Sequence, residues 1–264
     1  MELGYKGKVA GVTGAASPRG IGFAIARELL TEGARVFICD LKDGDVAKAV
    51  ESLGEYGEVR GYACDVSSEE QVRRMFDSAM EDFGKIDVFV SNAGIYPQIP
   101  LMEMTAAQWD TVMGVNLRSV LLCAKEAYRC MKGRGGVLVN ASSYSAVLGS
   151  AGSGAYAASK SAVSSMTKTL AAELAPFGIR VVGYIPGVID TGMTAPLLSI
   201  KGGQMVKQIA LNRLGTPRDV AKAVTFLASD AADYITGTFL EISGGKLCVQ
   251  NPDFMYSRLE EQNG

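Results

Sequence analysis

The sequence contains no histidine among its 264 residues. This absence excludes the Ser/His/Asp and Cys/His arrangements that commonly activate a nucleophile, and it removes the imidazole ligands that are usual at catalytic zinc. Acid–base chemistry in this chain must therefore use tyrosine, lysine, aspartate, glutamate or water. We expect no metal site.

A strong excess of charge and a long apolar run are also missing. Lysine and arginine number 26 against 28 aspartate and glutamate residues, so the net charge of −2 offers no positive surplus to neutralise nucleic-acid phosphates. The first residues, MELGYKGKVAGVTG, hold no apolar run of signal-peptide length, and no later stretch approaches the roughly 20 apolar residues of a membrane span. We expect a cytoplasmic protein whose partner is a small molecule rather than nucleic acid or a membrane.

Apolar runs alternate with helical patterns along nearly the whole chain. The runs KVAGVTG, ARVFICD and VRGYACD are separated by helical stretches, and further helices are expected near residues 69–83, 105–131 and 155–175. Continuously apolar strands are typical of a parallel sheet whose two faces are both covered by helices. We predict one α/β domain over residues 1–264, a Rossmann-type, doubly wound parallel sheet of about seven strands with helices on both faces.

Two segments depart from this regular alternation. Residues of about 190–212 contain a Gly202-Gly203 pair and a mixed pattern, which predicts a mobile flap beside the substrate. Residues 246–264 form an extended C-terminal tail.

The first strand runs into a glycine-rich segment, Thr13–Gly22, that opens an apolar helix. Glycine lets a backbone approach a pyrophosphate closely, and a helix N-terminus presents unpaired N–H groups to it. A glycine-rich turn that binds nothing is the alternative, but the strand-then-helix setting favours a dinucleotide site.

Two charged residues bear on the choice of dinucleotide. Asp40 ends the second strand, where a carboxylate accepts hydrogen bonds from ribose hydroxyls and repels a 2′-phosphate. Arg19 favours NADP instead, because a guanidinium there would pair with such a phosphate. We predict NAD rather than NADP, and we expect a weaker contact from Asp65 at the end of the third strand.

Tyr156 and Lys160 stand four residues apart at the start of a predicted helix, so their side chains share one helix face. Such a pair is more often a surface pair than a catalytic one. An ammonium beside a phenol would lower the tyrosine pKa below its reference of about 10. Ser143 ends the strand VLVNAS at the sheet edge where ligands gather, and Ser142 is a competing candidate for the same position.

A series of motifs follows one order along the chain: Thr13-Gly14 through Gly22, Asn92-Ala93-Gly94, Asn116 in GVNL, Ser143, Tyr156-x-x-x-Lys160 and Pro186-Gly187. This ordered set resembles that of the short-chain dehydrogenase/reductase family, from about Gly7 to Gly245. The resemblance implies a single Rossmann-fold domain that forms a homotetramer or a homodimer.

The resemblance also implies a role for each matching residue. Tyr156 would be the general acid/base, Ser143 would position the substrate oxygen, Lys160 would hold the nicotinamide ribose and tune Tyr156, and Asn116 would support a water relay. Cofactor contacts are implied for Gly14, Gly20, Val66, Asn92, Tyr156, Lys160, Ile189 and Thr191. The glycine loop ASPRGIG is two residues longer than the family's common form, so it stays open which of Ser17, Arg19 and Ile21 touches phosphate.

The activity that this resemblance implies is hydride transfer between a secondary alcohol and its ketone with NAD. The substrate stays open among a polyol, a sugar, a hydroxysteroid and a simple alcohol, since no arginine pair that would clamp an acidic group is evident. The alternatives are an NADPH-dependent 3-oxoacyl carrier-protein reductase and a dinucleotide-binding sensor without catalysis.

Overall fold

The computed structural model describes residues 2–149 and 151–263, so that Met1, Ser150 and Gly264 lie outside the described residues. Its centre is a seven-stranded sheet in the order β3-β2-β1-β4-β5-β6-β7, and every neighbouring pair is parallel. The strands are β1 (Val9–Thr13), β2 (Arg35–Asp40), β3 (Val59–Ala63), β4 (Val88–Ser91), β5 (Gly136–Ala141), β6 (Ile179–Pro186) and β7 (Phe239–Ile242). The predicted fold class is confirmed.

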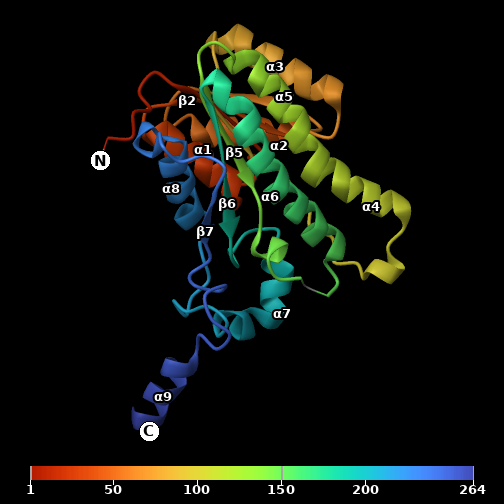
Figure 1. Ribbon diagram of the computed structural model, residues 1–264, viewed down its shortest axis with the longest axis vertical. Coiled ribbons are helices and arrows are strands. Elements are labelled where there is room, and N and C mark those ends of the chain that lie inside the picture. Colours follow the sequence, from red (N-terminus) through yellow and green to blue (C-terminus); the bar gives the residue numbers. More distant parts are fainter. Residues whose placement is uncertain (1, 150, 264) are drawn as a thin grey trace.

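Helices cover both faces of the sheet and bury a separate apolar cluster on each (Figure 1). One face carries α1 (Ile21–Thr31), α2 (Asp43–Leu53) and α8 (Pro217–Ala228). The other carries α3 (Glu69–Phe83), α5 (Ser119–Met131) and α6 (Gly154–Leu174). Strands β1 and β4 are buried at every position, which explains why they read as continuous apolar runs.

The strand order reverses between β1 and β4, because the chain fills the sheet outward from β1 to β3 and then crosses back to β4. In an open parallel sheet the crevice at such a reversal, beyond the carboxyl ends of the strands, is the favoured place for a ligand. The candidate site lies there.

The predicted helix over residues 105–131 is not one regular helix. It consists of α4 (Ala106–Met113), a π-helical turn (Gly114–Arg118) and α5. A π-turn leaves the apolar periodicity almost unchanged and is frequent at functional sites, so the pattern alone predicts an uninterrupted helix.

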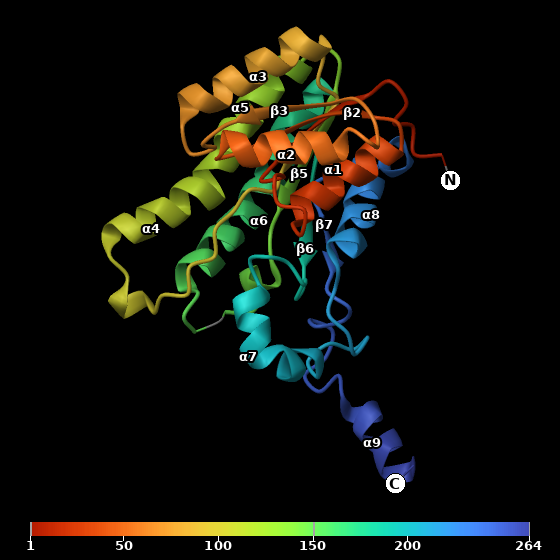
Figure 2. The ribbon, with the colours of Figure 1, turned by 180° about the vertical axis from the view of Figure 1, so that it is seen from behind.

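The predicted flap contains regular structure, since α7 (Ala195–Val206) occupies its middle. Pro196 in its first turn favours a helix start, and each internal glycine costs only about 1 kcal/mol relative to alanine. The tail ends in α9 (Phe254–Asn263), which extends away from the sheet on the side of α7 (Figures 1 and 2). Within the described residues, no helix has the length and apolarity needed to cross a membrane.

Candidate active site

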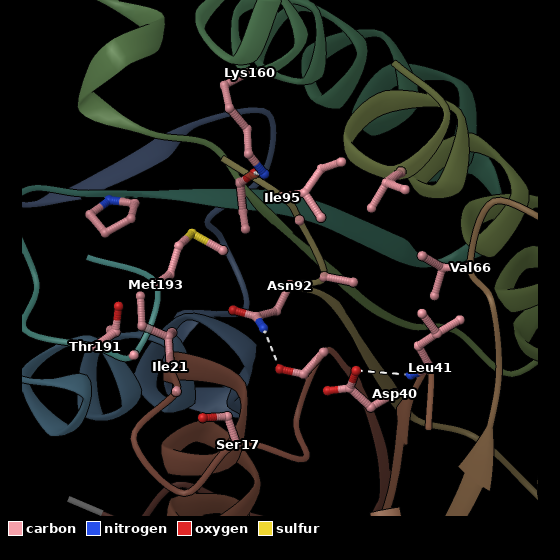
Figure 3. A pocket seen from close by; sticks show the side chains of 18 of the residues that line it. Ser17, Ile21, Asp40, Leu41, Val66, Asn92, Ile95, Lys160, Thr191 and Met193 are labelled. Atoms are coloured by element: carbon pink, nitrogen blue, oxygen red, sulfur yellow. Dashed lines mark hydrogen bonds between the residues drawn. The ribbon is translucent and has the colours of Figure 1, made fainter. Parts of the chain in front are cut away.

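A pocket of about 400 Å³ opens at the carboxyl ends of β1, β2, β4, β5 and β6. Asp40 lies toward one end of it and Lys160 toward the other, with Asn92 between them (Figure 3). The elongated spacing of these groups suits a dinucleotide better than a compact ligand. Its lining includes Gly14, Ser17, Gly20, Ile21, Asp40, Asp65, Val66, Asn92, Tyr156, Lys160 and Thr191.

The glycine loop brings the start of α1 against the end of β1. A Cβ on Gly22 would approach the Gly14 oxygen to 2.4 Å and Asn92 Nδ2 to 2.6 Å, so only glycine fits there without displacement. The N-cap residue of α1, Gly20, provides no side-chain hydrogen bond to the first turn. The start of α1 lines the pocket through Gly20 and Ile21, and its first N–H groups receive no side-chain cap, so the residues present fit the phosphates of a dinucleotide.

The Asn92 side chain connects the glycine loop to the sheet by hydrogen bonds. Its Nδ2 donates to the carbonyl oxygens of Thr13 (3.0 Å) and Gly14 (3.1 Å), and its Oδ1 accepts from the Tyr184 hydroxyl (2.8 Å). The amide thus acts on the backbone of β1 and on β6 as well as lining the pocket. Tyr184 also lines the pocket, and an apolar strand pattern gives no sign of its polar contact.

Asp40 reaches the pocket from the end of β2. Its Oδ2 accepts from the Ala16 backbone N–H at 3.0 Å, and its Oδ1 accepts from the Leu41 N–H at 2.8 Å. Arg19 does not line the pocket; it forms an ion pair with Asp190 (3.0 Å) in which the side chains are 64% and 52% exposed. The carboxylate therefore faces the pocket, and the guanidinium is engaged elsewhere.

Tyr156 lies on the first turn of α6, and its ring meets that of Tyr96 edge-on at 4.8 Å between centroids. Burial raises the pKa of Tyr156 to about 12, and a hydrogen bond with the Ser143 side chain opposes that rise. The prediction that Lys160 lowers this pKa is wrong for the isolated chain, because burial outweighs every other influence on the phenol.

Lys160 is buried, and its Nζ donates to the Ala141 carbonyl oxygen at 2.8 Å. Burial lowers the pKa of Lys160 to about 8. Its Nζ lies 5.9 Å from the centre of the Tyr156 ring, so the two side chains do share one side of α6. The ammonium is thus held beside the pocket by β5.

Ser143 and Ser142 have different partners. Ser142 Oγ lies 2.7 Å from Ser164 Oγ and donates to the Lys160 carbonyl oxygen, so its hydroxyl is turned toward the backbone of α6. Ser143 instead hydrogen-bonds with Tyr156 and accepts from the Ser145 N–H at 3.1 Å. The structure therefore places Ser143, rather than Ser142, against the tyrosine hydroxyl.

A family model described as enoyl-(acyl carrier protein) reductase matches residues 14–246. This range includes the glycine loop and the Tyr156-x-x-x-Lys160 pair. The chain belongs to the short-chain dehydrogenase/reductase family. As a member of this family it is an oxidoreductase that acts on CH–OH groups or ketones.

Three curated relatives show the breadth of substrates in the family. Cis-4-hydroxycyclohexanecarboxylate dehydrogenase of Sinomonas cyclohexanicum is 41% identical over 253 residues, which cover 94% of this chain and 100% of the relative. The 3-oxoacyl-[acyl-carrier-protein] reductase of Vibrio cholerae serotype O1 is 38% identical over 248 residues, 94% of this chain and 100% of the relative. Short-chain reductase protein NovJ of Streptomyces niveus is 38% identical over 247 residues, 90% and 93% of the two chains.

Four residues that the resemblance to short-chain dehydrogenases/reductases singles out lie outside the pocket lining: Arg19, Asn116, Ser143 and Ile189. Ile189 is buried in the core and forms a bridge with Gly215, away from the pocket surface. Ser143 is connected to the lining residue Tyr156 by a side-chain hydrogen bond. Among the residues described, no group of three or more carboxylate or cysteine side chains is arranged to hold a metal ion.

Asn116 lies in the π-turn and is completely buried. Its Oδ1 accepts from the Ile95 N–H at 2.8 Å, and its Nδ2 donates to the Ile95 carbonyl oxygen at 3.0 Å and to Ser159 Oγ at 3.2 Å. Both polar atoms of the amide thus bind neighbouring protein groups. In this short-chain dehydrogenase/reductase Asn116 connects the loop after β4 to α6.

Proposed function

We propose that this protein is an NAD-dependent dehydrogenase that interconverts a secondary alcohol and its ketone, with Tyr156 as the general acid/base. The observation that carries the choice of cofactor is the charge distribution of the pocket. Asp40 and Asp65 line one end, and Lys160, at the other end, is the one cation among the described lining residues. A 2′-phosphate at the Asp40 end would meet a carboxylate and no cation, whereas ribose hydroxyls would donate to it.

The side chains around Tyr156 suit transfer of a proton. The nicotinamide, when bound, supplies or accepts the hydride. In ketone reduction Tyr156 donates its phenolic proton to the substrate oxygen while Ser143 donates a hydrogen bond to the same oxygen, and both contacts strengthen as negative charge builds there. Lys160, held by the Ala141 carbonyl, provides a positive charge on the same side that stabilises the phenolate left behind.

A small cyclic or branched alcohol is the substrate that we infer. The substrate side carries aromatic and aliphatic groups, among them Tyr96, Ile95 and Met193. The Sinomonas relative, named for a hydroxylated cyclohexane carboxylate, supports a substrate of this kind. The Vibrio relative, named for a 3-oxoacyl carrier-protein substrate, supports the second candidate, a carrier-protein reductase.

Steady-state kinetics with NADH and NADPH over a panel of cyclic ketones and a 3-oxoacyl thioester tests the proposal. We expect NADH to be preferred and Asp40→Asn to narrow the preference about tenfold or more, because the amide keeps a hydrogen-bond acceptor but not the charge that repels a phosphate. Asp45→Asn, which removes an exposed carboxylate from α2 outside the pocket, serves as the matched control. A wild-type preference for NADPH with the thioester would overturn the proposal in favour of the second candidate.

A further inference from the structure

Lys246 lies close to the ring of Tyr144, the residue after Ser143. Its Nζ is 5.2 Å from the centre of that ring. The phenol of Tyr144 is close enough to Tyr156 to contribute to the rise of the Tyr156 pKa. Tyr144 is therefore a neighbour of both the Lys246 ammonium and the proposed acid/base.

A tight turn after β7 fixes the position of Lys246. Gly244 and Gly245 adopt φ angles of +65° and +85°, a conformation that favours glycine, and they lie next to residues 209–211, which follow α7. The Lys246 N–H donates to Ser243 Oγ at 3.1 Å. The Leu211 N–H donates to the Gly244 carbonyl oxygen at 3.0 Å, which ties the turn to the segment that follows α7. The backbone that carries this lysine is therefore held from two sides.

The ammonium itself has neutral surroundings. Its hydrogen-bond partner is Gln208 Oε1, at 2.8 Å. Among the carboxylates whose side chains the structure describes, none lies at ion-pair distance from Lys246. The nearby Glu241 carboxylate accepts from Ser243 Oγ instead. Lys246 is half-buried, and burial lowers its pKa. A partly desolvated cation without a counter-charge gains most from an anionic ligand.

We propose that Lys246 is a specificity-determining residue that binds a carboxylate of the substrate. This inference rests on the proposed function and narrows its substrate class to hydroxy or oxo carboxylic acids. Because Lys246 neighbours Tyr144, whereas the reacting carbon would lie at Tyr156, the carboxylate would be separated from the reacting carbon by several atoms, as across a ring, rather than adjacent to it. Sequence reasoning missed this residue because a lysine after a glycine pair has no distinctive pattern.

Turnover of two matched ketones tests the assignment. 4-Oxocyclohexanecarboxylate carries the charge and its methyl ester does not. We expect Lys246→Met to raise KM for the acid about tenfold or more, the usual size of a charge-assisted hydrogen bond, while kcat for the acid and KM for the ester change less than twofold. Lys246→Arg should restore most of the loss. Lys207→Met removes an exposed lysine directly before Gln208, the hydrogen-bond partner of Lys246; it is the control and should change the kinetics of neither ketone.

A binding measurement separates this inference from the proposed function. Cyclohexanecarboxylate and cyclohexanecarboxamide, which cannot react, are titrated calorimetrically into the protein in the presence of NADH. We expect the acid to bind the wild type at least about tenfold more tightly than the Lys246→Met variant, and the amide to bind both equally. Equal binding of the acid to both proteins would overturn the assignment, whatever the turnover. Absence of turnover with every ketone, together with charge-dependent binding, would overturn the proposed function and leave Lys246 as an anion site.

Discussion

At the scale of single residues, two opposing influences set the pKa of Tyr156. Burial raises its pKa to about 12, and the Ser143 hydrogen bond lowers it. Oxidation of an alcohol needs the phenolate, whereas reduction of a ketone needs the phenol. Because the pKa of the isolated site lies well above neutrality, the protonated form that suits reduction predominates at pH 7.

Alcohol oxidation and ketone reduction should depend differently on pH. Below the Tyr156 pKa, kcat/KM for alcohol oxidation should rise about tenfold per pH unit, since the fraction of phenolate rises in that proportion. Ketone reduction should stay nearly flat from pH 6 to about 7 and fall above pH 8, where Lys160 loses the positive charge that stabilises the phenolate. Ser143→Ala removes the contact that lowers the Tyr156 pKa, so the oxidation profile of this variant should move to higher pH.

Stopped-flow or steady-state profiles of both directions measure these shifts. Ser161→Ala provides the control, because its hydroxyl donates to the Ala146 carbonyl oxygen on the exposed side of α6. An oxidation profile that Ser143→Ala leaves in place, or moves to lower pH, contradicts the assignment of Ser143 to the tyrosine hydroxyl.

We predict that the buried ammonium of Lys160, which the proposed reaction needs, lowers the free energy of unfolding. Burial lowers its pKa to about 8 from the ordinary 10.5, so the folded state disfavours the charged form. This cost is fully present below pH 8 and fades between pH 8 and 10.5, where the unfolded chain holds a proton that the folded chain has released.

Lys160→Met should therefore unfold at higher urea concentration than the wild type at pH 7, by about 1–3 kcal/mol, while losing turnover. The difference in free energy of unfolding between this variant and the wild type should shrink as the pH approaches 10. Lys168→Met, at an exposed position of the same helix, should show neither effect. A Lys160→Met variant less stable than wild type at pH 7 would show that the Ala141 hydrogen bond outweighs the cost of burial.

At the scale of elements, periodicity predicts most of this fold. The predicted helix at residues 69–83 coincides with α3, because Ser68 caps its start and Gly84, with φ +74°, ends it. The π-turn and α7 were not predictable in this way. A π-turn depends on the tertiary bonds of Asn116, and α7 has no fully buried residue that would create an apolar stripe.

Asn116→Ala should destabilise the connection between the loop after β4 and α6. It leaves the Ile95 N–H and carbonyl without their partners, and unpaired buried groups of this kind cost about 1–3 kcal/mol each. We expect a loss of about 2 kcal/mol in the free energy of unfolding by urea, with reduced turnover because Ile95 lines the pocket. Thr111→Ala, on the exposed part of α4, should change stability by less than about 1 kcal/mol. Equal losses in the two variants would contradict the role given to Asn116.

At the scale of the whole molecule, the sequence predicts the class of sheet and the location of the site but not each partner. Asp40, Tyr156 and Lys160 could be placed at the carboxyl edge because each follows or faces the end of a strand. Two contacts join residues far apart in the chain: the ion pair of Arg19 with Asp190, and the contact of the Lys246 ammonium with the Tyr144 ring. Such contacts arise from the crossover geometry and leave no local pattern.

The same geometry makes cofactor binding a property of several elements together, since the Asn92 amide joins β1, β4 and β6 beneath the glycine loop. NADH at about 100 times its Kd should stabilise the protein by about 2.7 kcal/mol, measured as a rise in Tm. Tyr156→Phe should keep nearly all of this rise while losing turnover, because the phenolic proton serves chemistry rather than binding.

The Gly22→Ala variant should not show the NADH-dependent rise in Tm. Its Cβ would collide with the Gly14 oxygen and Asn92 Nδ2 and displace the glycine loop at the start of α1. Gly44→Ala is the matched control, since a Cβ there would meet nothing within 4 Å. If Gly22→Ala keeps the full NADH-dependent rise, the dinucleotide does not lie against the start of α1, and the pocket must hold it in another orientation.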